Sequence, residues 1–153
     1  MRSTFGIRAL QASSILVWIL WSEETKLGNP IQTPGVIFTE VDAVIPDLVW
    51  ESNQRWENGL DEAGHFVVAP ELNVEVLSAG EKNEQRDRQT KLKLYSLHGV
   101  QEYWIVNWRL KEIEVYRRED AVLQKVATLL VADKLTSPLL PGFECVVADV
   151  FPR

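Results

Sequence analysis

The sequence contains few of the residues that build disulfide frameworks or zinc centres. Its 153 residues include a single cysteine, Cys145, which excludes an internal disulfide and any multi-cysteine metal site. Only two histidines, His65 and His98, are present, so we expect no histidine-rich zinc centre. If this protein binds a metal, we therefore expect oxygen ligands and a hard divalent cation.

The chain also lacks an excess of positive charge and a long apolar run. Its net charge of −6 argues against a protein that coats nucleic acid through bulk charge. The apolar run at residues 15–21 is far shorter than the roughly 20 residues of a membrane-spanning helix. Arg2 and Arg8 precede this run, but no small-residue cleavage site follows it. We therefore expect a cytoplasmic protein with no signal peptide and no membrane attachment.

The length and the hydrophobic content of 46% fit one globular domain with a substantial core. We set residues 1–26 apart as an atypical apolar segment and expect a single domain over 27–153. Gly and Pro make residues 27–35 a predicted loop, and a long connection with a helical turn is expected over 52–69. Strands are predicted over 36–40, 43–51, 72–77, 103–107, 112–118 and 122–131, and a helix over 81–98 that ends at Gly99. This order predicts an α+β fold with a central helix on a mixed sheet.

The predicted strand at residues 71–77 has an acidic face. Alternation places Leu72, Val74 and Val76 on one side, and Glu71, Asn73, Glu75 and Leu77 on the other. Such alternation is ordinary for a half-buried strand with its polar side in water. The other interpretation is that the carboxylates bind a divalent cation, because ionised carboxylates that are buried need a metal or a lysine nearby.

Asp47 is a second acidic candidate, because it interrupts an apolar run. Val44 and Ile45 precede Pro46-Asp47, and Leu48-Val49-Trp50 follows. An aspartate at this place is either a functional group or a residue at a strand start that hydrogen-bonds local amides.

The predicted helix identifies one basic residue on its inner face. At about 100° per residue, Tyr95 lies about 40° to one side of Lys91 and Leu94 about 60° to the other. Lys91 is therefore at the centre of the apolar arc, whereas Lys93 lies on the opposite, solvent-facing side. A lysine at this place either pairs with carboxylates in the sheet or extends past its neighbours to water.

Together, these residues resemble the Uma-two family of restriction-endonuclease-like proteins. The resemblance covers about residues 36–151, and no single piece of it is diagnostic, but the ordered set is specific. It runs through Val41-Asp42-Ala43-Val44-Ile45-Pro46-Asp47-Leu48-Val49, Ala69-Pro70-Glu71-Leu72-Asn73-Val74-Glu75-Val76-Leu77-Ser78, Arg86-Asp87-Arg88, Lys91, Tyr95, Gly99-Val100-Gln101-Glu102-Tyr103-Trp104-Ile105-Val106, Val115-Tyr116-Arg117-Arg118 and Leu140-Pro141-Gly142-Phe143.

The resemblance implies a PD-(D/E)xK nuclease fold that hydrolyses DNA phosphodiester bonds with Mg²⁺. Asp47 matches the first acid and Glu75 the second. Glu71 stands where the family usually has an aspartate, and we expect this carboxylate to join Asp47 and Glu75 as a metal ligand. Leu77 occupies the position of the strand lysine, so the strict motif fails, and Lys91 on the helix matches the family's lysine instead. Basic residues available for local phosphate contacts are Arg86, Arg88, Arg109, Lys111, Arg117 and Arg118.

Two other functions stay open on the sequence alone. The residues before about 27 do not resemble the front region of the family, which suggests a truncated member that is catalytically inactive and acts as a binding module. Alternatively, the chain is an α+β interaction domain that forms a homodimer. That alternative predicts an exposed patch of Trp50, Trp56, Trp104 and Trp108, with Asp47, Glu75 and Lys91 spread apart.

Overall fold

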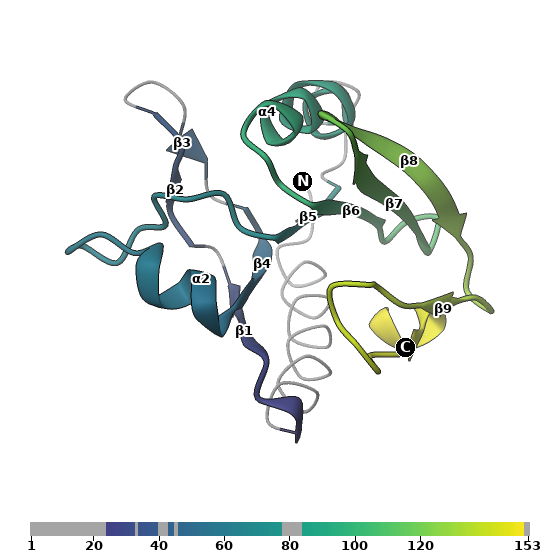
Figure 1. The fold of residues 1–153 in the computed structure, drawn as a ribbon. Helices are drawn as coiled ribbons and strands as arrows, with labels where there is room; N and C mark the ends of the chain where they lie inside the picture. The colour runs from purple at the N-terminus through teal and green to yellow at the C-terminus, as the bar shows by residue number, and fades with distance from the viewer. Residues whose placement is uncertain (1–23, 33, 40–42, 45, 78–83, 152–153) are drawn as a thin grey trace.

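The computed structural model describes residues 24–32, 34–39, 43–44, 46–77 and 84–151 of the chain. The apolar run at residues 15–21 lies outside these ranges. Six strands form the main sheet in the order β1-β4-β5-β6-β7-β8 (Figure 1). Their bounds are β1 Gly28–Gln32, β4 Leu48–Ser52, β5 Leu72–Val76, β6 Glu102–Asn107, β7 Glu112–Glu119 and β8 Val122–Leu129.

The sheet is mixed, because its central pair runs parallel. Strands β5 and β6 are parallel, whereas β1–β4, β4–β5, β6–β7 and β7–β8 pair antiparallel. Parallel neighbours need a crossover connection, and here a helical segment supplies it, with η1 at Arg86–Lys91 and α4 at Leu92–Leu97. The α+β architecture predicted from the sequence is confirmed, including the antiparallel meander that follows the helix.

Strand β1 is where the sequence prediction was wrong. Glycine and proline indicated a loop at residues 27–35, but Gly28–Gln32 pairs along its length with β4. β1 lies at the edge of the six-stranded sheet. A proline is tolerated in an edge strand when its nitrogen, which carries no hydrogen, faces away from the neighbouring strand. Pro30 is therefore compatible with a strand at this place, and only the position in the sheet reveals it.

The crossover helix begins with a wide turn. Arg86–Lys91 has π-helical geometry, in which backbone hydrogen bonds span five residues, and the regular α-helix covers only Leu92–Leu97. Gly99 ends the helix with a φ of +87°, a left-handed conformation that glycine adopts without strain. The assumed 100° per residue thus holds after Lys91 and fails before it.

Side chains from the sheet fill two cores on its opposite faces. On the helix side, Tyr95 packs with Tyr103, Ile105 and Leu77. On the other side, Leu72, Val74 and Val76 pack against the C-terminal segment, which holds β9 (Lys134–Leu135), β10 (Cys145–Val146) and the short helix η2 (Val147–Val150). Figure 1 shows α4 and the C-terminal segment on opposite sides of the strands β6–β8. Alternate residues of β5 therefore enter different cores, as the alternation predicted.

The remaining elements are short. β2 (Val36–Ile37) pairs with β3 (Ala43–Val44), and α2 (Asn53–Asn58) supplies the helical turn expected after β4. Trp50 and Trp104 are each 2% exposed and belong to the core beneath the C-terminal segment, so they form no exposed patch. Within the described part of the chain, none of the helices has the length and apolar character needed to span a membrane.

Candidate active site

The first two candidate acids lie side by side: Asp47 directly precedes β4, and Glu75 lies on the neighbouring strand β5. Leu48 of β4 pairs with Val74 of β5, so the antiparallel register puts Asp47 opposite Glu75. The Asp47 carboxylate oxygen Oδ2 accepts a hydrogen bond from the backbone N–H of Val76 at 2.7 Å. Asp47 thus does bond an amide, as one interpretation predicted, but the amide belongs to the neighbouring strand. This bond fixes the aspartate next to Glu75.

The crossover helix supplies two groups to Glu75. Lys91 Nζ lies 2.9 Å from Glu75 Oε2, and the Tyr95 hydroxyl donates to Glu75 Oε1 at 2.8 Å. Lys91 and Tyr95 are four residues apart and share one helix face. The lysine therefore pairs with the sheet, and the alternative in which it only extends to water is wrong.

Burial gives Glu75 unusual acid–base properties. The residue is 2% exposed, so β5 has no water-facing polar side at this point. Loss of solvation is the main cause that raises the pKa of Glu75 to about 8; Lys91 acts against it, and the nearby Asp47 carboxylate adds to it. Perturbed carboxyl groups of this kind gather at functional sites, where a charge partner and a low-dielectric environment coincide.

Two carboxylates and one ammonium group from three separate segments therefore meet at one end of the β4–β5 pair. Oxygen ligands of this type suit a divalent cation, with Asp47 and Glu75 as the candidate ligands. Over the described residues, no group of three or more His, Cys, Asp or Glu side chains is arranged to hold a metal. Two acids alone give an incomplete ligand set, so further oxygen atoms are needed.

The sequence matches a known protein family over nearly its whole length. The family described as "Uma2: Putative restriction endonuclease" matches residues 2–148. The chain belongs to the Uma2 family. The match begins at residue 2, whereas the resemblance seen in the sequence analysis began near residue 36. The family match therefore also covers residues 2–26, most of the N-terminal segment that was expected to be atypical.

The fold of this Uma2 member agrees with a solved structure. A crystal structure described as "a putative nuclease belonging to DUF820" from Anabaena variabilis superposes with a TM-score of 0.77 at 16% sequence identity. The superposition covers 99% of this chain and 82% of the other. At this identity the likeness concerns the fold. No curated protein matches the sequence.

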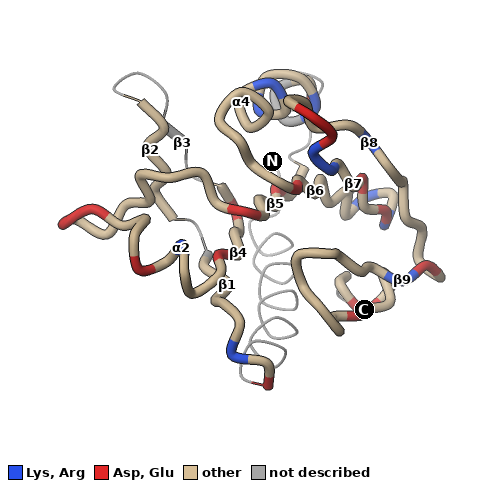
Figure 2. Tube along the Cα trace, in the orientation of Figure 1, with Lys and Arg blue, Asp and Glu red and all other residues tan. Residues whose placement is uncertain are grey.

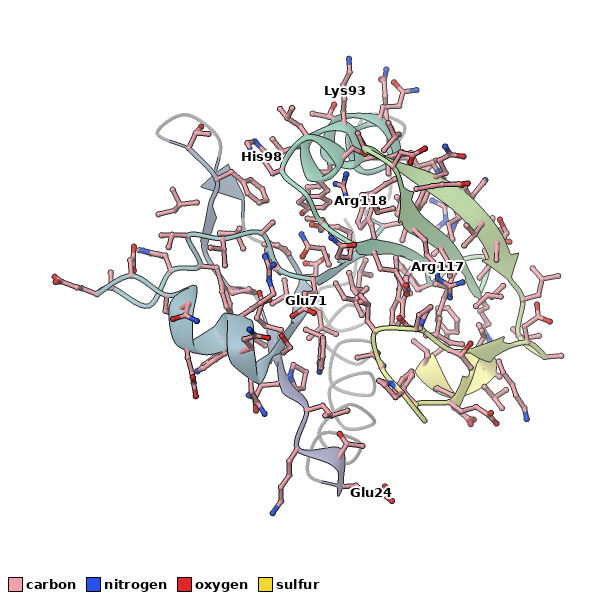
Figure 3. All side chains as sticks on the ribbon, viewed as in Figure 1. Glu24, Glu71, Lys93, His98, Arg117 and Arg118 are labelled. Atoms are coloured by element: carbon pink, nitrogen blue, oxygen red, sulfur yellow. The ribbon has the colours of Figure 1, made fainter. Side chains whose placement is uncertain are left out.

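Glu71, the third candidate acid, is not brought to this site. It lies four residues before Glu75, roughly 13 Å along the strand at about 3.3 Å per residue. Its Oε1 accepts a hydrogen bond from the backbone N–H of Ser52 at 2.9 Å and lies 4.0 Å from Arg55 Nε. Figure 3 places Glu71 between the sheet and α2. Glu71 therefore lies apart from Asp47 and Glu75 and does not share their site.

Glu71 instead belongs to a second acidic cluster with Glu51. Glu51 is fully buried, and its Oε1 accepts from Arg55 Nε at 3.0 Å. Burial raises the pKa of Glu51 to about 8, Arg55 acts in the opposite direction, and Glu71 raises it further. Burial therefore favours the protonated form of Glu51 in the folded protein.

The pKa of Glu51 predicts a stability that decreases with rising pH. Because the folded-state pKa of about 8 exceeds the ordinary value of 4.5, the stabilising contribution is complete below pH 4.5 and is lost as the pH rises through about 8. The loss approaches about 1.4 kcal/mol per pH unit at most. Glu51→Gln imitates the protonated carboxyl group and cannot ionise, so it should remove the part of the pH dependence that comes from Glu51.

Urea denaturation at about pH 5.5 and about pH 8.5 measures the effect. We expect the wild type to lose more unfolding free energy between these values than Glu51→Gln, because only the wild type has the Glu51 carboxyl group. The variant should still lose some, because other carboxyl groups with a raised pKa, such as Glu75, titrate in both proteins. Glu57→Gln, on the exposed side of α2, is the matched control and should behave as the wild type. Equal pH slopes for wild type and Glu51→Gln would show that Glu51 titrates normally.

Most of the expected phosphate-binding arginines are engaged inside this Uma2 fold. Arg88 Nε donates to Glu114 at 2.8 Å, and Arg117 Nε donates to Glu102 at 3.0 Å. Arg118 Nη2 donates to the Ser96 carbonyl at 2.6 Å, and Figure 3 shows Arg118 beneath α4. Figure 2 shows Lys and Arg positions interspersed with Asp and Glu along the α4–β8 part of the fold. Arg109 and Lys111 are exposed in the β6–β7 turn, and the Arg86 side chain lies outside the description.

Two residues next to the acids were not assigned roles from the sequence. Tyr95 was placed on the same helix arc as Lys91, and this spacing was the signal that it too reaches Glu75. Asn73 was placed on the acidic face of β5, two residues before Glu75, and it is fully buried. His98, by contrast, lies at the helix end and packs with its ring stacked on that of Phe38, with 4.4 Å between the ring centroids.

Proposed function

We propose that this Uma2 family member is a metal-dependent endonuclease that hydrolyses DNA phosphodiester bonds with Asp47, Glu75 and Lys91. The observation that supports the proposal most directly is the convergence of these three side chains, with 2.9 Å between Lys91 Nζ and Glu75 Oε2. Each comes from a different segment, so local sequence does not explain their meeting. Family membership supports the reaction class, and the geometry supports the choice of residues.

Asp47 and Glu75 would hold a magnesium ion, because carboxylate oxygens are the ligands that this cation prefers. When bound, the ion supplies a positive charge that polarises the phosphate and lowers the pKa of a water molecule at the site. The Val76 amide holds the Asp47 carboxylate in place through its hydrogen bond to Oδ2. The Tyr95 hydroxyl does the same for Glu75 Oε1.

Lys91 has a different task. Its ammonium group is mostly buried, with 13% of the side chain exposed, and it is anchored on Glu75. A fixed positive charge in a poorly solvated site stabilises negative charge that develops on the phosphate during attack. The lysine also offers further N–H donors, which can orient the attacking water. These roles follow from placement on the helix and do not need a lysine at position 77.

Plasmid nicking tests the proposal. The wild type should nick supercoiled DNA in Mg²⁺ and lose this activity in EDTA. Glu75→Gln should abolish nicking, because the amide is a poorer cation ligand than a carboxylate. Its circular dichroism spectrum should match the wild type, since glutamine resembles the protonated acid that burial favours.

Glu144→Gln, an exposed substitution in the β9–β10 region, is the control and should leave nicking unchanged. Nicking by Glu75→Gln at the wild-type rate would overturn the assignment of the site. Mg²⁺ binding in calorimetry without any nicking by the wild type would instead favour the binding-module alternative.

A further inference from the structure

We propose that the side-chain oxygen of Asn73 is the third protein ligand of the divalent cation held by Asp47 and Glu75. This inference rests on the proposed function and deepens it, because it names a residue that completes the metal site. It adds a neutral oxygen donor to the two carboxylates.

Asn73 is a buried polar side chain with no hydrogen-bond partner among the described residues. Its relative exposure is 0%, and neither Oδ1 nor Nδ2 has a hydrogen-bond partner in the described part of the chain. Burying an amide in this way is costly, because the hydrogen bonds it made with water are not replaced. Buried side chains with both polar atoms unpaired are rare, and a bound ion or water is the usual explanation.

The position of Asn73 in the sheet joins it to the two acids. Asn73 and Glu75 are two residues apart on β5, so their side chains leave the same face of the sheet, with Cα atoms roughly 7 Å apart. On β4, Val49 pairs with Asn73, and Asp47 lies two residues before Val49. The three polar residues therefore occupy two adjacent pairs on one face, and Val49 provides no hydrogen-bonding group that would satisfy the amide.

The chemistry of an asparagine oxygen suits this site. Oxygen-binding cations take amide oxygens together with carboxylates. Asp47 and Glu75 are already close enough for Asp47 to oppose ionisation of Glu75. A third carboxylate would add repulsion to this pair, whereas an amide adds an oxygen without charge. Hydrogen bonding from Nδ2 to an oxygen of the bound water or phosphate would then satisfy the other half of the side chain.

The test is a direct measurement of Mn²⁺ binding by the full chain, with free Mn²⁺ counted by electron paramagnetic resonance. This readout does not depend on catalysis. Asn73→Val removes the oxygen and suits a buried strand, and it should weaken binding at least about tenfold. Asn73→Asp keeps an oxygen and adds negative charge, so it should bind Mn²⁺ several times more tightly than the wild type. Glu75→Gln should weaken binding at least as much as Asn73→Val.

Gln124→Glu is the matched control, since it adds the same charge on β8, three strands away from β5. It should leave the affinity within about twofold of the wild type. Circular dichroism spectra show whether each variant folds. If Asn73→Val does not fold, Asn73→Asp decides the question: binding several times tighter than the wild type supports a ligand at position 73, and an unchanged affinity overturns it.

The outcomes separate the two proposals. Loss of Mn²⁺ binding in Glu75→Gln with unchanged binding in both Asn73 variants would overturn the role of Asn73 and leave the proposed function in place. An absence of Mn²⁺ binding by the wild type would overturn the metal site itself. Weaker binding by Asn73→Val together with tighter binding by Asn73→Asp would support the third ligand.

Discussion

Lys91→Met is expected to slow Mg²⁺-dependent DNA cleavage by about 10²- to 10³-fold, the usual effect of removing one fixed electrostatic group from an active site. Methionine retains the unbranched apolar chain of lysine, so the packing around α4 is conserved. The variant should fold, because Glu75 can take up a proton when the Lys91 ammonium group is removed. The protonated Glu75 can still accept the hydrogen bond from the Tyr95 hydroxyl. Single-turnover cleavage of a plasmid measures the rate.

Lys93→Met provides the control on the same helix. Lys93 is exposed on the solvent side and is labelled in Figure 3. Its substitution removes the same charge without touching Glu75, so cleavage should stay within about twofold of the wild type. If both variants slow cleavage equally, the lysines act through the general attraction of DNA, and Lys91 has no special role.

Glu102→Ala is expected to destabilise the fold by roughly 2–3 kcal/mol, because it removes the acceptor of buried hydrogen bonds. Glu102 is 1% exposed and accepts hydrogen bonds from Trp104 Nε1 at 2.6 Å, Arg117 Nε at 3.0 Å and Ser137 Oγ at 3.0 Å. The Ser137 bond ties the C-terminal segment to β6. Alanine would leave a buried indole N–H and a guanidinium group without this acceptor.

Urea denaturation checks this expectation, with Glu144→Ala as the reference. Glu144 also pairs with a basic residue, Lys134, at 2.8 Å, but both side chains are more than half exposed. Exposed pairs contribute little, so this variant should lose at most about 1 kcal/mol. A loss of similar size in Glu102→Ala would mean that the buried hydrogen bonds around Glu102 are replaced by water.

The fold and much of the candidate site could be read from the sequence, because both depend on regular periods. Alternation separated the two faces of β5, and the helical period put Lys91 on the inner face. Strand β1 was missed because a proline indicates a loop until its edge position is known. Glu71 was grouped with Glu75 because the period of two reports the face but not the distance along the strand.

Other features depend on contacts that no local pattern contains. Arg88, Arg117 and Arg118 looked available for phosphate contacts, yet each finds an acceptor that is distant in sequence. Whether an arginine meets solvent or an internal carboxylate is decided by how the helix and the meander pack. For the same reason, the sequence placed Asn73 on the correct face but could not indicate that neither of its polar atoms finds a partner in the described part of the chain.

The wide turn at Arg86–Lys91 has a consequence for comparisons within the family. A π-helical turn accommodates an additional residue compared with a regular α-helical turn. A relative with a regular helix here would need one residue fewer between the second acid and the lysine to present the ammonium group at the same place. A sequence alignment without a gap in this turn would then place Lys91 one position away from the equivalent lysine of that relative. A member that keeps the lysine would be scored as lacking it.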